Sequence, residues 1–587
     1  MVDENTLGRE PVTIVEIDQS FCSLTYGNAP CTAAVGTTGT FKCYNTRTTC
    51  QDPDNFTSSS LTLRFCTQSD AFPSPSEAEL YLPIVESVSS NPTELNIGNG
   101  NGDINPLGRR ASVTITMRDI AYNDARIDNY VATRGFNPLD QGTFWVKFLA
   151  RNKHYQNRPL RVREGYIGQT VASMRTRNYI IEKISNADSS GRVTIVAKDI
   201  LKLADDKRAQ APLPSTGVLD ADISFYATTL TLTPSGIGNS DYPASGKAII
   251  GSEIVSFTRS ADVITLTERG VNNTTADDHT EGDTFQLCLE YTAERVDDVI
   301  YDLLTTYGNI DASYITQADW TAEADVWLVT SLVTTVITEP TGVSKLIGEL
   351  TEQAGCFIWW DDVNQKIRFQ AAKPVRADSI YTVSEDTQII AETVSITQEP
   401  SQRISQVWIY YRMIDYTQDL AKPANFNKLR VNVDLDAEST DQYGESRIRR
   451  IFSRWYTASN DAETITLGSR ILLAYRDNPI YIQFDLDAKD RDIEIADVIE
   501  FTHRSFVDFQ GETEPVLLQI ISREEVESGH RIRYKAQLFG FVGRFAFIME
   551  NTANDFDAAT DDEKRNGGYI CNNSGLMGDG SQGYKII

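Results

Sequence analysis

The chain has 587 residues and carries 82 acidic against 54 basic side chains, a formal net charge of −28. Hydrophobic residues make up 41% of it and aromatic residues 10%, which excludes wholesale disorder and suggests about four domains. An acidic surface repels phosphate and so argues against nucleic-acid binding. The best apolar run, residues 326–337, is interrupted by Ser and Thr and is shorter than the roughly 20 residues that span a bilayer, so we expect no membrane segment.

Strand patterns dominate the first 212 residues. β-Branched and aromatic residues are concentrated at 11–26, 60–66, 78–87, 110–120, 143–149, 160–168, 179–185 and 192–199. Short segments of this kind at fairly regular spacing predict a β-barrel or a β-sandwich. Residues 27–56 interrupt the series with a polar loop rich in Gly, Thr and Asn, which a compact domain accommodates only if something else holds it.

Helical patterns appear only in the second half of the chain. Residues 218–286, which follow the boundary marked by Pro212, Pro214 and Gly217, read as a self-contained all-β segment. Apolar residues at helical spacing then predict helices over 292–307 and 341–353, the second leading into a hairpin over 356–370.

The remainder of the chain returns to a mainly β pattern. Its predicted elements are strands at 404–411, 480–486, 497–501, 515–521 and 530–539 and one helix at 461–475. From residue 547 the sequence is polar and without periodicity, which predicts an arm that orders against a partner or stays disordered.

Together these segments predict a mainly β, multidomain protein with smaller α+β parts. The predicted units are an N-terminal strand with a Cys-rich module (1–72), a first β-barrel-like domain (73–212), an inserted small β module (213–290), a helix–hairpin α+β domain (291–400), a second β-barrel-like domain (401–545) and an extended C-terminal arm (546–587).

Five of the eight cysteines fall within the first 66 residues, and four of them follow the pattern C-x8-C-x11-C-x6-C: Cys22, Cys31, Cys43 and Cys50. The N-terminus lacks the basic and apolar regions of a secretory signal, so we expect synthesis in a cytoplasm, where clustered thiols favour metal binding over disulfides. Four thiolates complete the coordination of a [4Fe-4S] cluster or of a zinc ion, and spacings wider than C-x2-C favour the cluster. Buried apolar cysteines, or disulfides formed after release from the cell, are the alternatives.

Nothing in the sequence marks a catalytic centre. The four histidines, His154, His279, His503 and His530, are far apart in the sequence, and G-x-S-x-G, Walker, H-E-x-x-H and kinase motifs are absent. We therefore expect a protein that is not an enzyme.

Several segments together resemble the tail-hub, or tail-tip, proteins of long non-contractile-tailed bacteriophages and of gene transfer agents. They are LTYG at 24–27, KCYNTRTTCQDPDNF at 42–56, LTLRF at 61–65, GRRASVTITMRDI at 108–120, TFWVKFLARN at 143–152 and VTIVAKDILKLADDKRAQAP at 193–212. The lambda-like tail-tip proteins hold a [4Fe-4S] cluster with two pairs of cysteines, one with eight residues between and one with six. Carried over, this pattern implies Cys22, Cys31, Cys43 and Cys50 as ligands, with Cys66 as an alternative to Cys22.

The resemblance also implies a function, a location and partners. Such hubs form a homotrimeric ring that closes the tail tube in the virion, between a ring of distal tail protein and a central tip or fibre protein, near the end of the tape-measure protein. DNA would pass through the acidic lumen without specific binding. Two other functions remain open on the residues alone: an adhesin whose inserted β module binds a host surface and whose cysteines form disulfides, and a tail-associated cell-wall hydrolase.

Overall fold

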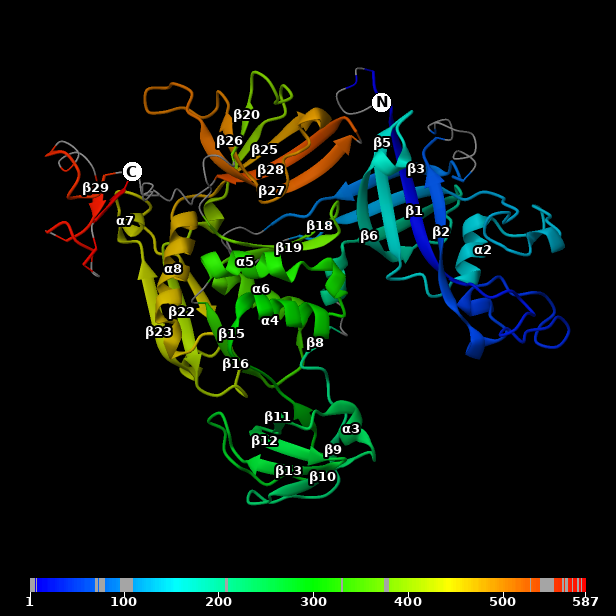
Figure 1. Cartoon of the computed structure of the whole chain (residues 1–587), viewed down its shortest axis with the longest axis horizontal. Coiled ribbons are helices and arrows are strands. Elements are labelled where there is room, and N and C mark those ends of the chain that lie inside the picture. Colours follow the sequence, from blue (N-terminus) through cyan, green and yellow to red (C-terminus); the bar gives the residue numbers. More distant parts are fainter. Residues whose placement is uncertain are drawn as a thin grey trace. The chain divides into compact units, whose positions relative to one another are not determined.

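The computed structural model describes residues 6, 8–68, 72, 80–95, 109–205, 209–328, 331–373, 380–527 and 529–538, and most of 554–586. The chain divides into two compact units, Met1–Phe539 and Gly540–Ile587. Several separate sheets with smaller helical parts make the protein mainly β and multidomain, which confirms the predicted fold class (Figure 1). Within the described residues no helix is both long and apolar enough to cross a membrane.

The first sheet has seven strands in the order β2-β1-β5-β6-β7-β4-β3. They are β1 (Pro11–Cys22), β2 (Ser58–Cys66), β3 (Val85–Asn91), β4 (Ser112–Arg118), β5 (Pro159–Tyr166), β6 (Arg175–Ile184) and β7 (Arg192–Lys198). Alternate residues such as Val113, Ile115 and Met117 of β4 point into one buried core. Leu82 bridges to Phe65 of β2 shortly before β3 begins, so the sheet nearly closes on itself.

Two strands predicted in this region differ from the structure: the one predicted at 78–87 begins only at Val85, as β3, and the one predicted at 143–149 is wrong. Residues 143–149 are not extended, because helix α2 (Phe144–Arg151) occupies them. Its one face carries Phe144, Trp145 and Phe148 into the core of the first sheet, and Asp119 caps its first turn by accepting a hydrogen bond from the Trp145 N–H (2.8 Å). Tertiary burial and a cap from a distant residue therefore override the β propensity of the aromatic residues.

The predicted all-β segment 218–286 is a six-stranded sheet in the order β14-β11-β12-β13-β10-β9. Its strands are β9 (Val218–Leu219), β10 (Thr229–Thr233), β11 (Ser245–Ile250), β12 (Glu253–Ser260), β13 (Val263–Glu268) and β14 (Phe285–Leu287), with a short helix α3 (Ile237–Asp241). Hydrogen bonds between residues 217–219 and 283–285 join the two edges, so this module is a small barrel with its own apolar core.

The α+β domain corrects two expectations. The helix predicted over 292–307 begins later, because β15 (Leu289–Arg295) pairs with β16 (Leu332–Ile337) before α4 (Val296–Asp302) starts, and residues 303–307 continue as a π-helical turn. Helix α5 (Gln317–Trp327) was not predicted, because only Trp320 and Ala324 turn buried side chains to the core and leave almost no periodic signal.

The predicted helix at 341–353 and the hairpin after it are confirmed. They form α6 (Val343–Ala354), β18 (Cys356–Asp361) and β19 (Lys366–Ala371), and a two-residue strand β17 (Thr341–Gly342) pairs with β8 (Gln210–Ala211).

The predicted strands and helix beyond residue 400 are confirmed as well. The three-stranded sheet β23-β22-β24 consists of β22 (Gln406–Met413), β23 (Phe426–Val433) and β24 (Ile448–Phe452), with α7 (Leu435–Glu438) following β23 and α8 (Asp461–Tyr475) following β24. A six-stranded sheet follows the order β20-β26-β27-β28-β25-β21, with β20 (Tyr381–Ser384), β21 (Ser395–Gln398), β25 (Ile480–Asp487), β26 (Val498–Thr502), β27 (Val516–Glu527) and β28 (Arg531–Leu538). In the second compact unit, β29 (Gly568–Ile570) pairs with β30 (Tyr584–Ile586).

A buried ionic junction links the first sheet to the six-stranded sheet that contains β27. Arg177 of β6 lies 2.6 Å from a carboxylate oxygen of Glu525 in β27 and 3.2 Å from one of Glu164 in β5. Against the attraction of Arg177, burial raises the pKa of Glu164 and the Glu525 carboxylate adds to the shift, so Glu164 is the protonated member of this acid pair. Glu525 stays ionised, because Arg177 and the hydrogen bond with Glu164 outweigh its burial and hold its pKa below the ordinary value.

Removing the cation from this junction is expected to destabilise the first unit strongly. Arg177→Met leaves the buried Glu525 carboxylate without its partner, which costs about 3–5 kcal/mol of unfolding free energy. Arg118→Met is the matched control, because Arg118 pairs with Glu86 on the surface of the same sheet, where such pairs contribute about 0–1 kcal/mol. Denaturant unfolding of both variants measures the difference, and equal losses would contradict the assignment.

Candidate metal centre

The Cys-rich loop is the connection of a β-hairpin. Strands β1 and β2 pair antiparallel from Ile14 opposite Cys66 to Cys22 opposite Ser58. The loop of residues 23–57 therefore leaves and re-enters the sheet at adjacent positions, and Cys22 lies at its base. Inside the loop the only regular structure is two single 3-10 turns, Arg47–Thr49 and Pro53–Asn55, and neither has a buried residue. Apolar packing of its own therefore does not explain how this loop keeps its shape.

The loop brings four cysteines together. Cys22, Cys31, Cys43 and Cys50 all line the same small hollow, part of which is open to solvent. Cys22 is buried, the other three are half-buried, and all eight cysteines of the chain are free thiols. Tyr26 and Ala33 line the hollow too. The side chains of Cys31 and Cys43 pack against these two residues.

Cys66, the alternative ligand, lies elsewhere. It is separated from the Ser58 end of β2 by eight residues of extended chain, about 26 Å at the usual rise per residue. Its side chain is 0% exposed and packs among Val12, Ile14, Phe72 and Met174. One metal centre therefore cannot include both Cys22 and Cys66. Of these two residues, Cys22 is the one that lines the hollow.

Asn45 fixes the backbone next to the thiols. It has a left-handed backbone (φ 54°), is 2% exposed, and its side-chain amide donates to the carbonyls of Cys22 and Leu24 (3.1 Å each). Its backbone N–H bonds the sulfur of Cys43, and the N–H of Asp52 bonds the sulfur of Cys50 in the same i+2 relation. Backbone N–H groups aimed at cysteine sulfurs stabilise thiolates, which are the form that binds a metal.

Residues about 100 positions later in the chain complete the surroundings of the loop, and sequence reasoning missed them. The Arg134 guanidinium donates to the carbonyl of Cys43 (2.8 Å), and both it and the Arg151 guanidinium lie within 3.9 Å of the Tyr44 ring centre. The Tyr130 hydroxyl accepts a hydrogen bond from the Tyr26 N–H (2.7 Å). Both guanidiniums are themselves paired with carboxylates, Arg134 with Asp128 and Arg151 with Asp124, so they anchor the loop to the segment that follows β4.

Two of the thiols, those of Cys43 and Cys50, resist ionisation without a metal. Burial raises the pKa of Cys43 and of Cys50 above the ordinary value of 9.0, and repulsion from the neighbouring cysteines adds to both shifts. The two backbone hydrogen bonds act in the opposite direction without reversing the shift. A bound metal charge would remove this cost, since thiolates repel one another only while nothing positive lies between them.

A single ion and a cluster require different spacings of the four thiols. Sulfurs that share one tetrahedral zinc lie about 3.8 Å apart, given a Zn–S distance near 2.3 Å. In a [4Fe-4S] cluster each cysteine binds its own iron, so the sulfurs lie farther apart. Among the residues that the structure describes, no three Cys, His, Asp or Glu side chains are arranged to hold one metal ion. The four thiols that line the hollow are of the ligand type that either group takes.

The raised thiol pKa values predict slow alkylation of the metal-free protein. Because the thiolate is the nucleophile, Cys43 and Cys50 should react with iodoacetamide more slowly at pH 7 than a free cysteine peptide does. Their rates should rise with pH and reach half-maximum above 9.0. Mass spectrometry of the separate peptides gives both rates, and half-maximum at or below that of the free peptide would contradict the electrostatic account.

Comparison with known proteins gives distant structural likeness only. No protein-family model matches the sequence, and no curated protein matches it. Similar solved structures include the 43 kDa tail protein of prophage MuSo2 from Shewanella oneidensis, with a TM-score of 0.36 and 10% identity over 77% of this chain and 93% of that one.

Two further solved structures show an equally distant similarity to this chain. Prophage tail protein gp18 from Listeria monocytogenes has a TM-score of 0.32 and 10% identity over 82% of this chain and 91% of that one. A chain of a native gene transfer agent virion has a TM-score of 0.28 and 11% identity over 57% of this chain and 91% of that one. At these scores the likeness assigns no function, and the mainly β fold is established by the sheets of the chain itself.

Proposed function

We propose that the protein is a structural hub of a phage-like tail in the virion, without enzymatic activity, whose Cys22, Cys31, Cys43 and Cys50 hold a [4Fe-4S] cluster. The observation that carries the metal centre is the convergence of these four cysteines, from three separate stretches of a loop and its base strand, on one hollow. The hub function rests on the resemblance of the Cys-rich stretch and of the strands around it to tail-hub proteins.

The cluster would act as a fold-holding group. Residues 23–57 lack an apolar core of their own, so binding free energy at the four thiols would become folding free energy of the loop. The residues of this chain would contribute the thiolates, the N–H groups of Asn45 and Asp52 at two sulfurs, and the Arg134 and Arg151 guanidiniums nearby. Redox turnover is not required for this function.

The assembly that we propose is a homotrimeric ring that closes the tail tube. It would contact a ring of distal tail protein, a central tip or fibre protein and the end of the tape-measure protein. The net charge of −28 supports a lumen through which DNA slides without specific binding, because acidic walls repel phosphates.

Anaerobic purification tests the cluster directly. The protein should be brown, with about four iron and four acid-labile sulfide per chain. Cys43→Ser should lose the colour and both elements, whereas Cys66→Ser should keep them, because Cys66 lies at the far end of the hairpin. A colourless wild type with zinc, or with disulfides among these cysteines, would overturn the cluster; disulfides would favour the adhesin instead.

Light scattering tests the assembly independently of the metal. The full chain should give a mass about three times its 65.5 kDa. A chain that ends at Phe539 keeps the whole first compact unit, so it should fold, and we expect it to assemble more weakly. A monomeric full chain at micromolar concentration would contradict the ring even if the cluster is present.

A further inference from the structure

At one end of the small barrel of residues 218–287, two loops are fixed against each other. Residues 220–228 connect β9 to β10, and residues 269–284 connect β13 to β14. The backbones of Ile223 and His279 exchange both of their hydrogen bonds (2.9 Å each), which joins the loops like a short piece of sheet. The geometry of this end is therefore set by the loops together.

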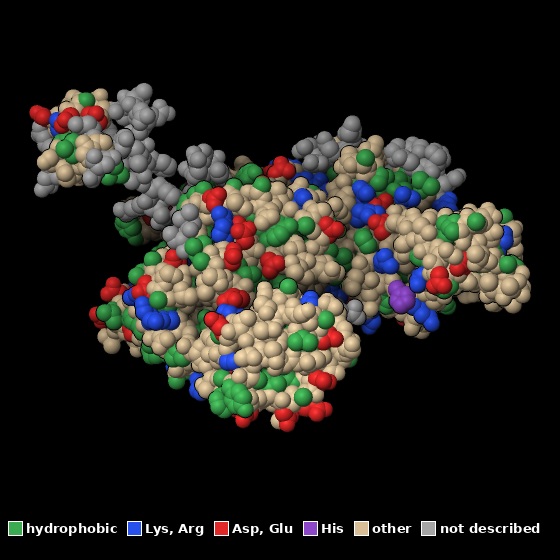
Figure 2. Space-filling model, turned by 60° about the horizontal axis from the view of Figure 1, so that its bottom comes forward, with side chains coloured by type: hydrophobic (Ala, Val, Ile, Leu, Met, Phe, Trp, Pro, Cys, Tyr) green, Lys and Arg blue, Asp and Glu red, His purple; other side chains and the backbone are tan. Residues whose placement is uncertain are grey.

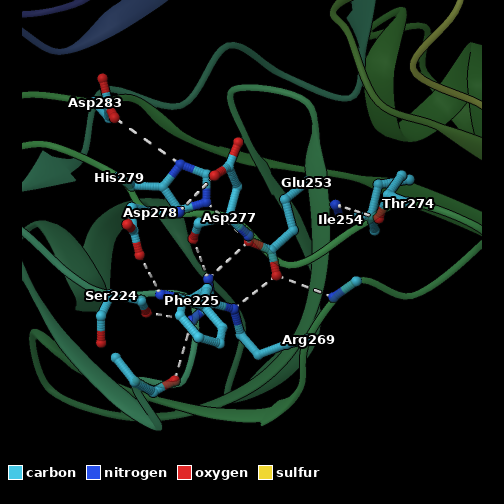
Figure 3. Close-up of polar contacts among 12 residues, drawn as sticks. Ser224, Phe225, Glu253, Ile254, Arg269, Thr274, Asp277, Asp278, His279 and Asp283 are labelled. Atoms are coloured by element: carbon cyan, nitrogen blue, oxygen red, sulfur yellow. Dashed lines mark hydrogen bonds and ion pairs between the residues drawn. The ribbon is translucent and has the colours of Figure 1, made fainter.

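One buried carboxylate organises both loops (Figure 3). Glu253, at the start of β12, is 0% exposed and accepts from Arg269 Nε (2.6 Å) and Nη2 (2.7 Å), and from the N–H groups of Gly270 (2.9 Å) and Asp277 (3.1 Å). His279 Nε2 lies 2.8 Å from its second oxygen. Burial by itself raises the pKa of Glu253, but the hydrogen bonds from Arg269 and His279 outweigh it and hold that pKa below its ordinary value.

The same network holds residues 220–228, the loop that carries the aromatic residues Phe225 and Tyr226. Arg269 Nη1 donates to the carbonyls of Ser224 (3.0 Å) and Ala227 (3.2 Å), one on each side of them. Asp278 accepts a hydrogen bond from the Phe225 N–H (2.7 Å), as Figure 3 shows. The backbone from 224 to 227 is thus fixed from both ends.

Phe225 and Tyr226, here called the aromatic tip, nevertheless face solvent. Their side chains are 56% and 74% exposed, and their rings stand edge to face with centres 5.2 Å apart. Two neighbouring large aromatic side chains held out of the core by a rigid network mark a binding surface, because they gain nothing from exposure to water.

Charge selects the kind of partner. Residues 213–290 carry eleven acidic and three basic side chains. The basic ones are engaged within the module: Arg269 with Glu253, Lys247 with Glu290, and Arg259 with the carbonyls of Tyr242 and Pro243. Figure 2, in which this module faces the viewer, shows Asp and Glu side chains along its margin together with exposed hydrophobic ones.

We propose that the aromatic tip binds a lysine or arginine side chain presented by a basic partner protein. The faces of Phe225 and Tyr226 attract a cation through their ring quadrupoles, and the carboxylate of Asp278 beside Phe225 adds Coulomb attraction. An anionic surface is repelled by the same charges. This binding involves no part of the Cys-rich loop, so it stands or falls separately from the metal centre.

Calorimetry with the full chain and the peptide Gly-Arg-Gly-Arg-Gly tests the proposal. Binding should weaken with added salt. Tyr226→Leu keeps an apolar side chain but removes the ring, and should weaken binding about two- to fivefold, whereas Tyr226→Trp should retain it. Val263→Ala, at another exposed apolar position of the barrel, is the control and should bind like the wild type. Because Tyr226 is exposed, thermal unfolding of its variants should match the wild type.

Three results would overturn the proposal. Equal binding of Gly-Glu-Gly-Glu-Gly would show that charge does not select the ligand. Unchanged affinity of Tyr226→Leu would show that the ring is not in contact with the cation. Binding of the neutral sugar maltotriose with no binding of the arginine peptide would assign the tip to carbohydrate instead.

Discussion

The structure around the cysteines depends on one constraint: a long polar loop has to start and end at neighbouring positions of a β-hairpin. The pairing of Cys22 with Ser58 closes residues 23–57, and this closure costs chain entropy that the loop cannot recover by burying apolar side chains. Hydrogen bonds offset part of this entropy cost instead, such as those that the Asn45 side-chain amide donates to the carbonyls of Cys22 and Leu24. In the metal centre that we propose, the four thiols that line one hollow would add the free energy of metal binding.

In the small barrel of residues 218–287, polar loops are likewise ordered without an apolar core of their own, but no thiols are involved. There a single buried carboxylate, Glu253, accepts hydrogen bonds from Arg269, from His279 and from two backbone N–H groups, and so orders two loops together. A buried charge is unfavourable unless it is fully paired, and this one is. In both places a compact polar centre fixes a loop whose outer residues are then presented to solvent in a defined geometry.

Electrostatics also explains how so acidic a chain folds. Several of its buried carboxylates are paired with arginines from other strands, as Glu164 and Glu525 are with Arg177 and as Glu16 is with Arg161. The negative excess is thereby moved to the surface, where water and salt screen it. There it discourages contact with phosphates and favours contact with cationic partners.

The sequence by itself determined the fold class and most elements. Two-residue alternation identified strands such as β4 and β25, and three-to-four-residue periodicity identified α6 and α8, because burial on one face leaves a local pattern. Periodicity failed for α2, whose Phe144 and Trp145 read as a strand, and for α5, which buries only two side chains. The cysteine spacing nominated Cys22, Cys31, Cys43 and Cys50 because those residues carry their chemistry wherever they lie.

Only the tertiary structure decided which groups surround them. Strand register placed Cys66 at the far end of the hairpin from Cys22, and register depends on pairing that no local pattern contains. Arg134, Arg151 and Tyr130 contact the loop from about 100 residues away, and their sequence neighbourhood gives no sign of it. The aromatic tip was not predicted either, because its exposure depends on the hydrogen bonds of Arg269 and Asp278, which no local pattern around Phe225 and Tyr226 reveals.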